Sequence, residues 1–360
     1  MNTRDDSNLD FLRAMAVLVV VAAHMIFFFG IVSFGPLNLM PLGLLGVLIF
    51  FVHTSFVLML SLERQWNQSK NDLFFVFMAR RCFRILPLSI LVLILIVVFR
   101  LPQGELYPGK FVASVWTWWE LFCNLALIQN LAKKDSILTV LWSLPYEMQM
   151  YIFLPWLFLF LRAARSIRRS VLLWMLSLAA AIFSLHHLRH IPDLALYIPC
   201  FMPGVIAYQL QQKERSRLPA FLWPIAVALL GVLYLAGASW ALGWGGAETR
   251  WAVRWGLGLM FGCAVPRFSQ LSVRWLVVAS HFIAKYSYGI YLTHCFAIWL
   301  AFERMRDLPG EVRILVFIVS AIGLPILFYH VVEEPMIHIG KRLADRIPSR
   351  RKVQVAVAVS

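Results

Sequence analysis

The sequence predicts an all-α, polytopic membrane protein, and three observations indicate this fold class. Of the 360 residues, 61% are hydrophobic and only 14% are charged. Apolar runs long enough to cross a bilayer recur along the whole chain, which a water-soluble core could not accommodate. The charged residues gather between these runs, so we expect about ten membrane-spanning helices joined by mostly short loops.

The expected spans follow one another at residues 9–29, 41–62, 84–100, 139–161, 169–187, 193–211, 219–242, 250–265, 276–302 and 311–332. The first span is too long for a signal-peptide core and lacks a small-residue cleavage site, so we interpret it as a retained helix. A basic loop, Glu63 to Arg84, separates the second span from the third. The stretch 111–131 mixes tryptophans with Glu120, Asn124 and Gln129, which is typical of an amphipathic helix at a membrane interface.

The distribution of lysine and arginine predicts the orientation, because these residues are enriched in cytoplasmic loops. Ten spans with the N-terminus inside put 22 of them on the cytoplasmic side and 10 outside. Counting 111–131 as an eleventh span changes the split to 15 against 17. We therefore expect ten spans, both termini in the cytoplasm and an outer amphipathic helix. A single membrane domain, residues 1–340, is expected to precede a basic cytoplasmic tail, residues 341–360.

The net charge of +15 raises the question of nucleic-acid binding. No DNA- or RNA-binding motif accompanies the charge, and basic loops beside spanning helices are what orientation in a bilayer requires. We therefore expect the lipid bilayer, and no nucleic acid, as a partner. The five cysteines are scattered without a CxxC spacing or a partnering histidine cluster, so neither a metal site nor a disulfide is predicted.

Arg13 and His24 are the most informative residues of the first span. Ten residues separate them, and an eleven-residue step on an α-helix returns to nearly the same face, about 16 Å farther along the axis. Ionisable side chains are costly inside a bilayer, so this face should border a polar cavity or a ligand. Burial disfavours the charged imidazole, so His24 is a candidate general base. The alternative is a hydrogen-bonded interhelical histidine.

Two more arginines, Arg81 and Arg84, lie at the cytoplasmic end of the third span, near the expected depth of Arg13. Guanidinium groups bind phosphate in a forked geometry, so these three residues could hold a phosphorylated ligand. Arg80 is better explained by anchoring at the membrane surface. Asp10, three residues before Arg13, either orients its guanidinium or is only an acid at a helix start.

Further polar residues are expected at membrane depth. Glu147 would be expensive facing lipid, so it either binds an acceptor hydroxyl in an outward-facing cleft or packs against Tyr146 or Tyr151. His53 and His294 lie within the second and ninth spans and are candidates for substrate contact. No role is assigned to four other histidines, His186, His187, His190 and His330.

At this point the motifs resemble those of one family. Five or six short motifs appear in order, namely Leu9 to Ala16 followed by His24, Phe50 to Phe56, Arg81 to Pro87, Leu141 to Tyr151, Ser287 to His294 and Glu333 to Pro335. This series resembles the acyltransferase 3 family of membrane O-acyltransferases, whose hallmark is an arginine, ten residues and a histidine. Two positions depart from the family pattern. Thr54-Ser55 replaces the usual Ser-Gly, and Met148 replaces a common second glutamate.

The resemblance implies an acyltransferase of the bacterial inner membrane. Acyl-coenzyme A, most often acetyl-CoA, would be the donor substrate, with no permanently bound cofactor. Arg13, Arg81 and Arg84 would hold its phosphates, and its pantetheine arm would run along the first helix to His24. His24 would act as the catalytic base, supported by Arg13 and Glu147.

The acceptor implied by the resemblance is a hydroxyl of an extracytoplasmic or lipid-linked carbohydrate. His53, Glu147 and His294 would contact this substrate, and glycan-assembly proteins are candidate partners. A transporter or flippase of a lipid-linked or anionic glycan is the alternative, because polar residues at membrane depth also mark transport paths. The expected internal repeats and paired broken helices of a transporter are not visible in the sequence. A structural scaffold would not need these ionisable residues.

Overall fold

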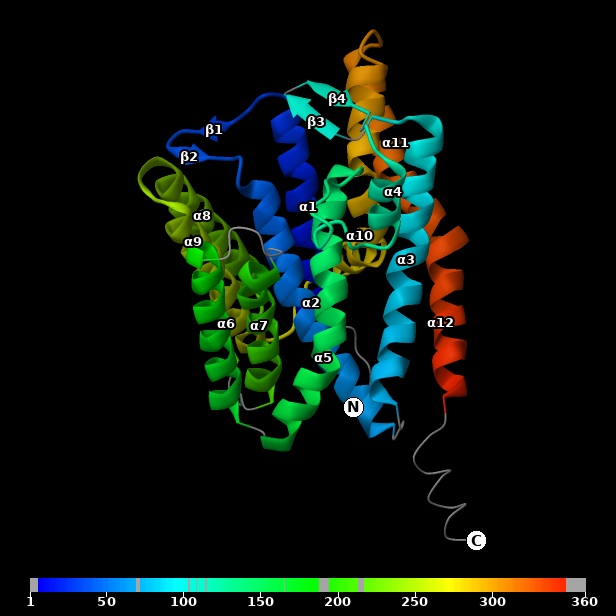
Figure 1. Ribbon diagram of the computed structural model, residues 1–360. Helices are drawn as coiled ribbons and strands as arrows, with labels where there is room; N and C mark the ends of the chain where they lie inside the picture. The colour runs from blue at the N-terminus through cyan, green and yellow to red at the C-terminus, as the bar shows by residue number, and fades with distance from the viewer. Residues whose placement is uncertain are drawn as a thin grey trace.

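The computed structural model describes residues 6–347, apart from 69–71, 103, 108, 114, 165, 188–193 and 213–216. Ten long helices form a bundle (Figure 1). They are α1 (Ser7–Phe28), α2 (Leu42–Asn67), α3 (Leu73–Phe99), α5 (Leu144–Ala164), α6 (Ile167–His187), α7 (Leu194–Gln211), α8 (Leu222–Trp244), α9 (Ala247–Ala264), α10 (Arg274–Ile298) and α11 (Gly310–Phe328). The predicted all-α, polytopic class is confirmed.

Eight helical segments of the described chain are long and apolar enough to cross a membrane. The last of them joins α11 to α12 (Glu334–Arg346) through a π-helical turn, Tyr329–Glu333. The two remaining expected spans correspond to α9 and α10, which are helical but less apolar. Glu248, Arg250 and Arg254 lower the hydropathy of α9, and α10 buries serine, tyrosine, threonine and histidine side chains in the interior of the bundle.

The predicted basic loop 63–84 is wrong in its extent. Helix α2 continues to Asn67 and α3 already begins at Leu73, so all four arginines of this segment are helical. Helical structure persists there because the segment contains good helix formers and packs against α12. Arg80 Nη2 lies 3.3 Å from Asp345 Oδ1 of α12, which fits the anchoring role expected for Arg80.

Short elements connect the bundle at the end opposite that of α12 (Figure 1). Two small hairpins, β1 (Ser33–Phe34) with β2 (Leu37–Asn38) and β3 (Gly104–Tyr107) with β4 (Lys110–Val112), were not predicted. The expected interfacial helix is α4 (Trp118–Leu125), which is too short to span a bilayer. A capping box begins it, and the backbone and side-chain bonds from Thr117 lower the pKa of the Glu120 carboxyl.

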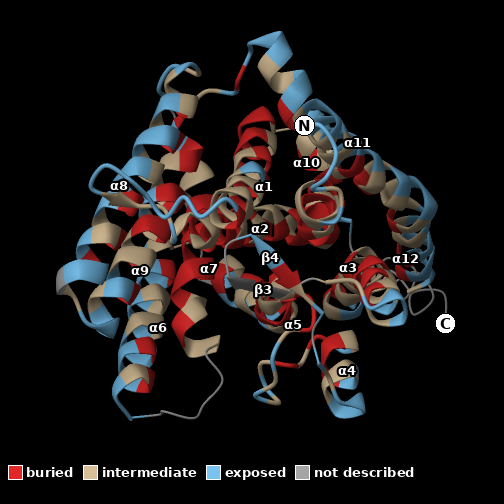
Figure 2. Cartoon of the chain, turned by 90° about the horizontal axis from the view of Figure 1, so that it is seen from above, coloured by how far each residue is buried: buried red, intermediate tan, exposed pale blue. Residues whose placement is uncertain are grey.

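Helix α1 occupies the centre of the bundle, between α2 and α10 (Figure 2). Its inner face is buried, and so are large parts of α2, α7 and α10. The described chain begins and ends at the same end of the bundle, as an even number of spans requires (Figure 1). Residues 341–346 of the expected tail continue α12, and positions 348–360 lie outside the described residues.

Candidate active site

Helix α1 places Arg13 and His24 against the same neighbour, α10. Arg13 Nε donates a hydrogen bond to Ser287 Oγ at 2.6 Å, and His24 Nδ1 lies 3.3 Å from His294 Nε2. Ser287 and His294 are seven residues apart on α10, which is two helical turns. The prediction that Arg13 and His24 share one face of α1 is therefore confirmed.

Arg13 opens into a cavity of about 700 Å³, here called the arginine cavity. Its lining contains five of the predicted site residues, Arg13, His53, Arg81, Arg84 and Glu147. These come from four helices, so the fold gathers residues that are far apart in the sequence. The predicted residues His24 and His294 are not part of this lining.

The charges around the arginine cavity are predominantly positive. Arg13, Arg81 and Arg84 face it, and Glu147 is the carboxylate in its lining. The Tyr151 hydroxyl donates a hydrogen bond to Glu147 Oε1, as the packing alternative for Glu147 predicted. The structure thus places Glu147 beside the arginines, where an anionic ligand would bind, and not in a separate outward-facing cleft. This arrangement suits a phosphate or another anion.

A second and larger cavity, here called the vestibule, lies at the end of the bundle where α1 begins. It contains about 1280 Å³ of empty space and shares Arg13, His53 and Arg84 with the arginine cavity. Arg64 and Lys285 add two more cations to its lining. The vestibule therefore connects the arginine cavity with the end of the bundle that carries the N-terminus.

Both acidic and basic side chains line the vestibule. Asp10 Oδ2 lies 2.9 Å from His281 Nδ1, so Asp10 pairs with α10 and does not orient Arg13 as one alternative proposed. Asp6 caps the start of α1, and burial raises the pKa of its carboxyl. His53 is buried and lines both cavities, and no described residue forms a hydrogen bond with its Nδ1. His53 therefore lies where the two cavities meet.

His24 opens into a different cavity of about 500 Å³, here called the histidine pocket. Ala23, Ile26, Phe27, Leu39, Met40 and Gly43 complete its lining. It shares no lining residue with the arginine cavity. The Tyr291 ring, which lines the arginine cavity, lies 6.2 Å from the His294 ring and 6.0 Å from the Phe50 ring. The expected donor path along α1 is thus not continuous in this structure.

Backbone carbonyls define the tautomers of both histidines. His24 Nδ1 lies 2.9 Å from the Val20 carbonyl, and His294 Nδ1 lies 3.0 Å from the Ile290 carbonyl. Since a carbonyl only accepts, each neutral ring carries its proton on Nδ1. The Nε2 atom of His24 therefore keeps the lone pair that a general base needs.

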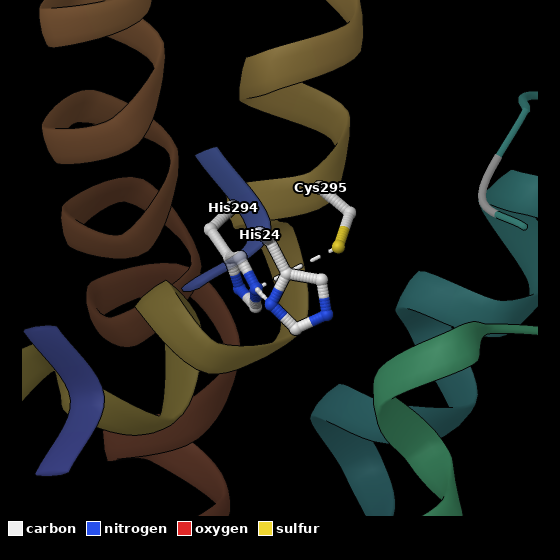
Figure 3. A group of neighbouring side chains, drawn as sticks. All are labelled: His24, His294 and Cys295. Carbon is white, nitrogen blue, oxygen red and sulfur yellow. Dashed lines mark hydrogen bonds between the residues drawn. The ribbon is translucent and has the colours of Figure 1, made fainter. Parts of the chain in front are cut away.

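The structure also identifies residues that sequence reasoning missed. Glu333 is buried, and its Oε1 lies 3.5 Å from Arg84 Nη2. Ser287 anchors Arg13, and the Cys295 thiol lies 3.6 Å from His294 Nε2 (Figure 3). Glu333 and Ser287 belong to motifs noted in the sequence, which was a usable signal, whereas nothing in the spacing of Cys295 pointed to a histidine partner.

A helical bundle with an arginine-lined cavity on one side of a membrane-depth histidine would suit a membrane protein that handles an anionic ligand. Comparison with known families is more specific. A family model described as an acyltransferase domain matches residues 6–330. The chain belongs to this acyltransferase family, as its motifs predicted.

Two curated relatives match parts of the chain. Peptidoglycan O-acetyltransferase OatA of Listeria monocytogenes is 26% identical over 231 residues, which are 60% of this chain and 34% of that protein. YrhL of Bacillus subtilis, which carries the same enzyme name provisionally, is 31% identical over 154 residues, covering 41% of this chain and 23% of its own length. The matched regions thus span about a third or less of these relatives. No solved structure matches.

Proposed function

We propose that this protein is a membrane acyltransferase that moves an acyl group, in the first place acetyl, from cytoplasmic acyl-coenzyme A to a hydroxyl of an extracytoplasmic or lipid-linked carbohydrate. One observation carries the proposal. Helix α1 presents Arg13 to two arginine-lined cavities and His24 to a separate pocket near its other end. Family membership and the names of the two relatives support the reaction class.

The donor enters through the vestibule in this proposal. Coenzyme A carries several phosphate groups, which Arg64, Arg84 and Lys285 attract at the mouth and Arg13 binds deeper in. Arg81 and Glu147 border the next part of the path, the arginine cavity. Glu147 orients the guanidinium groups, and His53 contacts the donor where the two cavities meet.

The transfer step occurs at His24. His24 Nε2 accepts the proton of the acceptor hydroxyl while the hydroxyl oxygen attacks the thioester carbonyl. The carbon–sulfur bond breaks, and the coenzyme A thiolate leaves and takes up the proton from His24. For the thioester to reach His24, the arginine cavity and the histidine pocket must join, and in this proposal the rings of Phe50 and Tyr291 move apart to connect them. His294 holds the His24 ring in place during the step.

The acceptor approaches through the histidine pocket, on the side of the membrane opposite the vestibule. Both relatives are named for peptidoglycan, a bacterial glycan, and this supports a carbohydrate acceptor and a bacterial inner-membrane location. The orientation follows from the excess of lysine and arginine on the vestibule side.

Purified protein and radiolabelled acetyl-CoA test the proposal. Base catalysis typically contributes about 10² to 10⁴ in rate, so His24→Ala should lose this factor in coenzyme A release and in label transferred to added glycan, while remaining folded. His187→Ala, at an exposed histidine of α6, is the matched control and should retain full activity. Activity of His24→Ala comparable with the wild type would refute the role of His24. If neither protein binds or turns over acetyl-CoA, transport of a glycan becomes the better explanation.

A further inference from the structure

Three side chains with metal-binding atoms meet at the closed end of the donor path, and the reaction proposed above does not require all of them. They are His24 from α1 and the adjacent pair His294 and Cys295 from α10 (Figure 3). Their ligand atoms all lie within 4.8 Å of one another. His294 and Cys295 are fully buried, so this set is an interior feature of the bundle and not a chance cluster on its surface.

The distances within this set fit a tetrahedral ion. Bond lengths of about 2.0–2.1 Å to nitrogen and about 2.3 Å to sulfur place two nitrogen ligands about 3.3 Å apart, and a nitrogen and a sulfur ligand about 3.6 Å apart. His24 Nδ1 and His294 Nε2 are 3.3 Å apart, and His294 Nε2 and Cys295 Sγ are 3.6 Å apart. The ligand atoms of the third pair, His24 and Cys295, lie within 4.8 Å of each other.

The three candidate ligand atoms form only weak hydrogen bonds with one another. The proton on His24 Nδ1 is directed to the Val20 carbonyl, and a thiol is a weak donor. The lone pair of His294 Nε2 therefore has only long contacts. The opposite nitrogen of His294 donates to the Ile290 carbonyl, which is the outer-shell bond that commonly orients a metal-binding histidine.

His24 lines the histidine pocket, so this pocket is the side from which an ion would approach the set. Two imidazoles and one thiolate are ligands that favour zinc and similar thiophilic ions over magnesium or calcium. We propose that His24, His294 and Cys295 bind one such divalent ion, of the zinc type, and that the bound ion inhibits the protein by occupying its general base.

Binding of the metal ion would change the protonation of Cys295 and of His24. Cys295 releases its thiol proton to the solvent and binds as the thiolate. His24 binds through Nδ1, so its single proton moves to Nε2 and the bond to the Val20 carbonyl is lost. Because Nε2 is then protonated, His24 can no longer accept the proton of an acceptor hydroxyl. The inhibitory consequence rests on the proposed function, whereas the metal site does not.

Cobalt(II) binding to the purified full-length protein tests the site directly. Wild-type protein should bind one equivalent, with a thiolate-to-cobalt charge-transfer band and the visible absorption of a tetrahedral site. Cys295→Ser and Cys295→Ala should lose the charge-transfer band, with folding checked by thermal unfolding and size-exclusion chromatography. Cys263→Ser, at a half-buried cysteine of α9, is the matched control and should keep it. A band that survives both Cys295 variants, or no band in the wild type, would overturn the site.

Zinc inhibition of acetyl transfer tests the consequence. Submicromolar to micromolar zinc should abolish wild-type activity. Relative to its own metal-free rate, Cys295→Ser should need at least tenfold more zinc for the same fractional loss. Equal zinc sensitivity of the two proteins would overturn the inhibitory role. A wild-type protein that binds cobalt but transfers no acetyl group would refute the proposed function and leave the metal site standing.

Discussion

At the scale of single residues, the ion pair between Arg84 and the buried Glu333 links the arginine cavity to the π-helical turn that follows α11. Glu333 is 1% exposed, and no described residue donates a hydrogen bond to its carboxylate oxygens. Arg84 is the cation that lies against it, at 3.5 Å. Removing one partner of a buried ion pair leaves an uncompensated charge, which is more harmful than removing both.

We therefore expect Arg84→Met to destabilise the fold by about 3–5 kcal/mol, the usual cost of an orphaned buried charge. The double variant Arg84→Met with Glu333→Met should recover most of this loss, since no charge is left buried. Thermal unfolding in detergent measures both. A double variant as unstable as Arg84→Met alone would show that the ion pair is not the source of the instability.

A second prediction concerns the hydrogen bond that positions Arg13. Ser287 Oγ accepts from Arg13 Nε, and bonds to charged groups contribute about 1.5–3 kcal/mol. Ser287→Ala should raise the KM for acetyl-CoA roughly tenfold or more with a smaller change in kcat, because the proposed function assigns Arg13 to donor binding. Ser320→Ala is the control, since that hydroxyl bonds only within its own helix. A Ser287→Ala effect confined to kcat would contradict this role.

The sequence predicted the ionisable residues of the site but not their partners. Arg13, His24 and Glu147 are conspicuous because charges in apolar runs are costly and few. Ser287 and Cys295 are ordinary residues for a membrane helix. Ser287 matters through its contact with Arg13 of α1, more than 250 positions away, and Cys295 through its contact with His294, which meets His24 of α1. Such contacts depend on how helices pack, which a single sequence does not determine.

At the scale of elements, the position of α1 depends on its close approach to α2. A Cβ atom at Gly46 would lie 2.6 Å from the Ala16 carbonyl oxygen and from a Val20 methyl group. The Val20 carbonyl also defines the tautomer of His24, so the spacing of the two helices and the geometry of the base are coupled. Only glycine fits at this contact without moving a backbone.

Gly46→Ala should therefore separate α1 from α2, cost about 1–3 kcal/mol as overpacking does, and lower acetyl transfer. Gly256→Ala in α9 is the matched control, because its Cβ would meet nothing within 4 Å. The control should be neutral or slightly stabilising, since alanine has the higher helix propensity. Thermal unfolding and transfer rate measure the two variants. Equal behaviour of Gly46→Ala and Gly256→Ala would refute the close-contact argument.

Hydropathy predicted most helices correctly because spans must be long and apolar. It predicted too short a helix for α3, because the first turns of that helix carry arginines and resemble a polar loop. It gave no indication of the π-helical turn that carries Glu333. Helix α10 shows that hydropathy alone does not reveal where polar side chains lie. Its polar side chains face the interior of the bundle, and hydropathy does not distinguish that environment from water.

At the scale of the whole molecule, the cavities divide the protein into two sides. The vestibule and the arginine cavity open toward the end that carries the N-terminus, whereas the histidine pocket lies beyond the rings of Phe50 and Tyr291. Such a division matters for the proposed function, because a cytoplasmic thioester and an extracytoplasmic hydroxyl never share a compartment. The proposed reaction would have to bring them together inside the bundle.

This arrangement predicts strictly sided activity in membrane vesicles. Inverted vesicles expose the cytoplasmic face, so acetyl-CoA added outside should acetylate glycan enclosed within them. Right-side-out vesicles should use only acetyl-CoA trapped inside, because the phosphate-binding cations lie on the cytoplasmic side under the lysine and arginine distribution. Val115→Cys, fully exposed between β4 and α4, reports orientation when labelled with an impermeant maleimide. Equal use of added acetyl-CoA by both vesicle types would place the donor site on the wrong face and reverse the proposed topology.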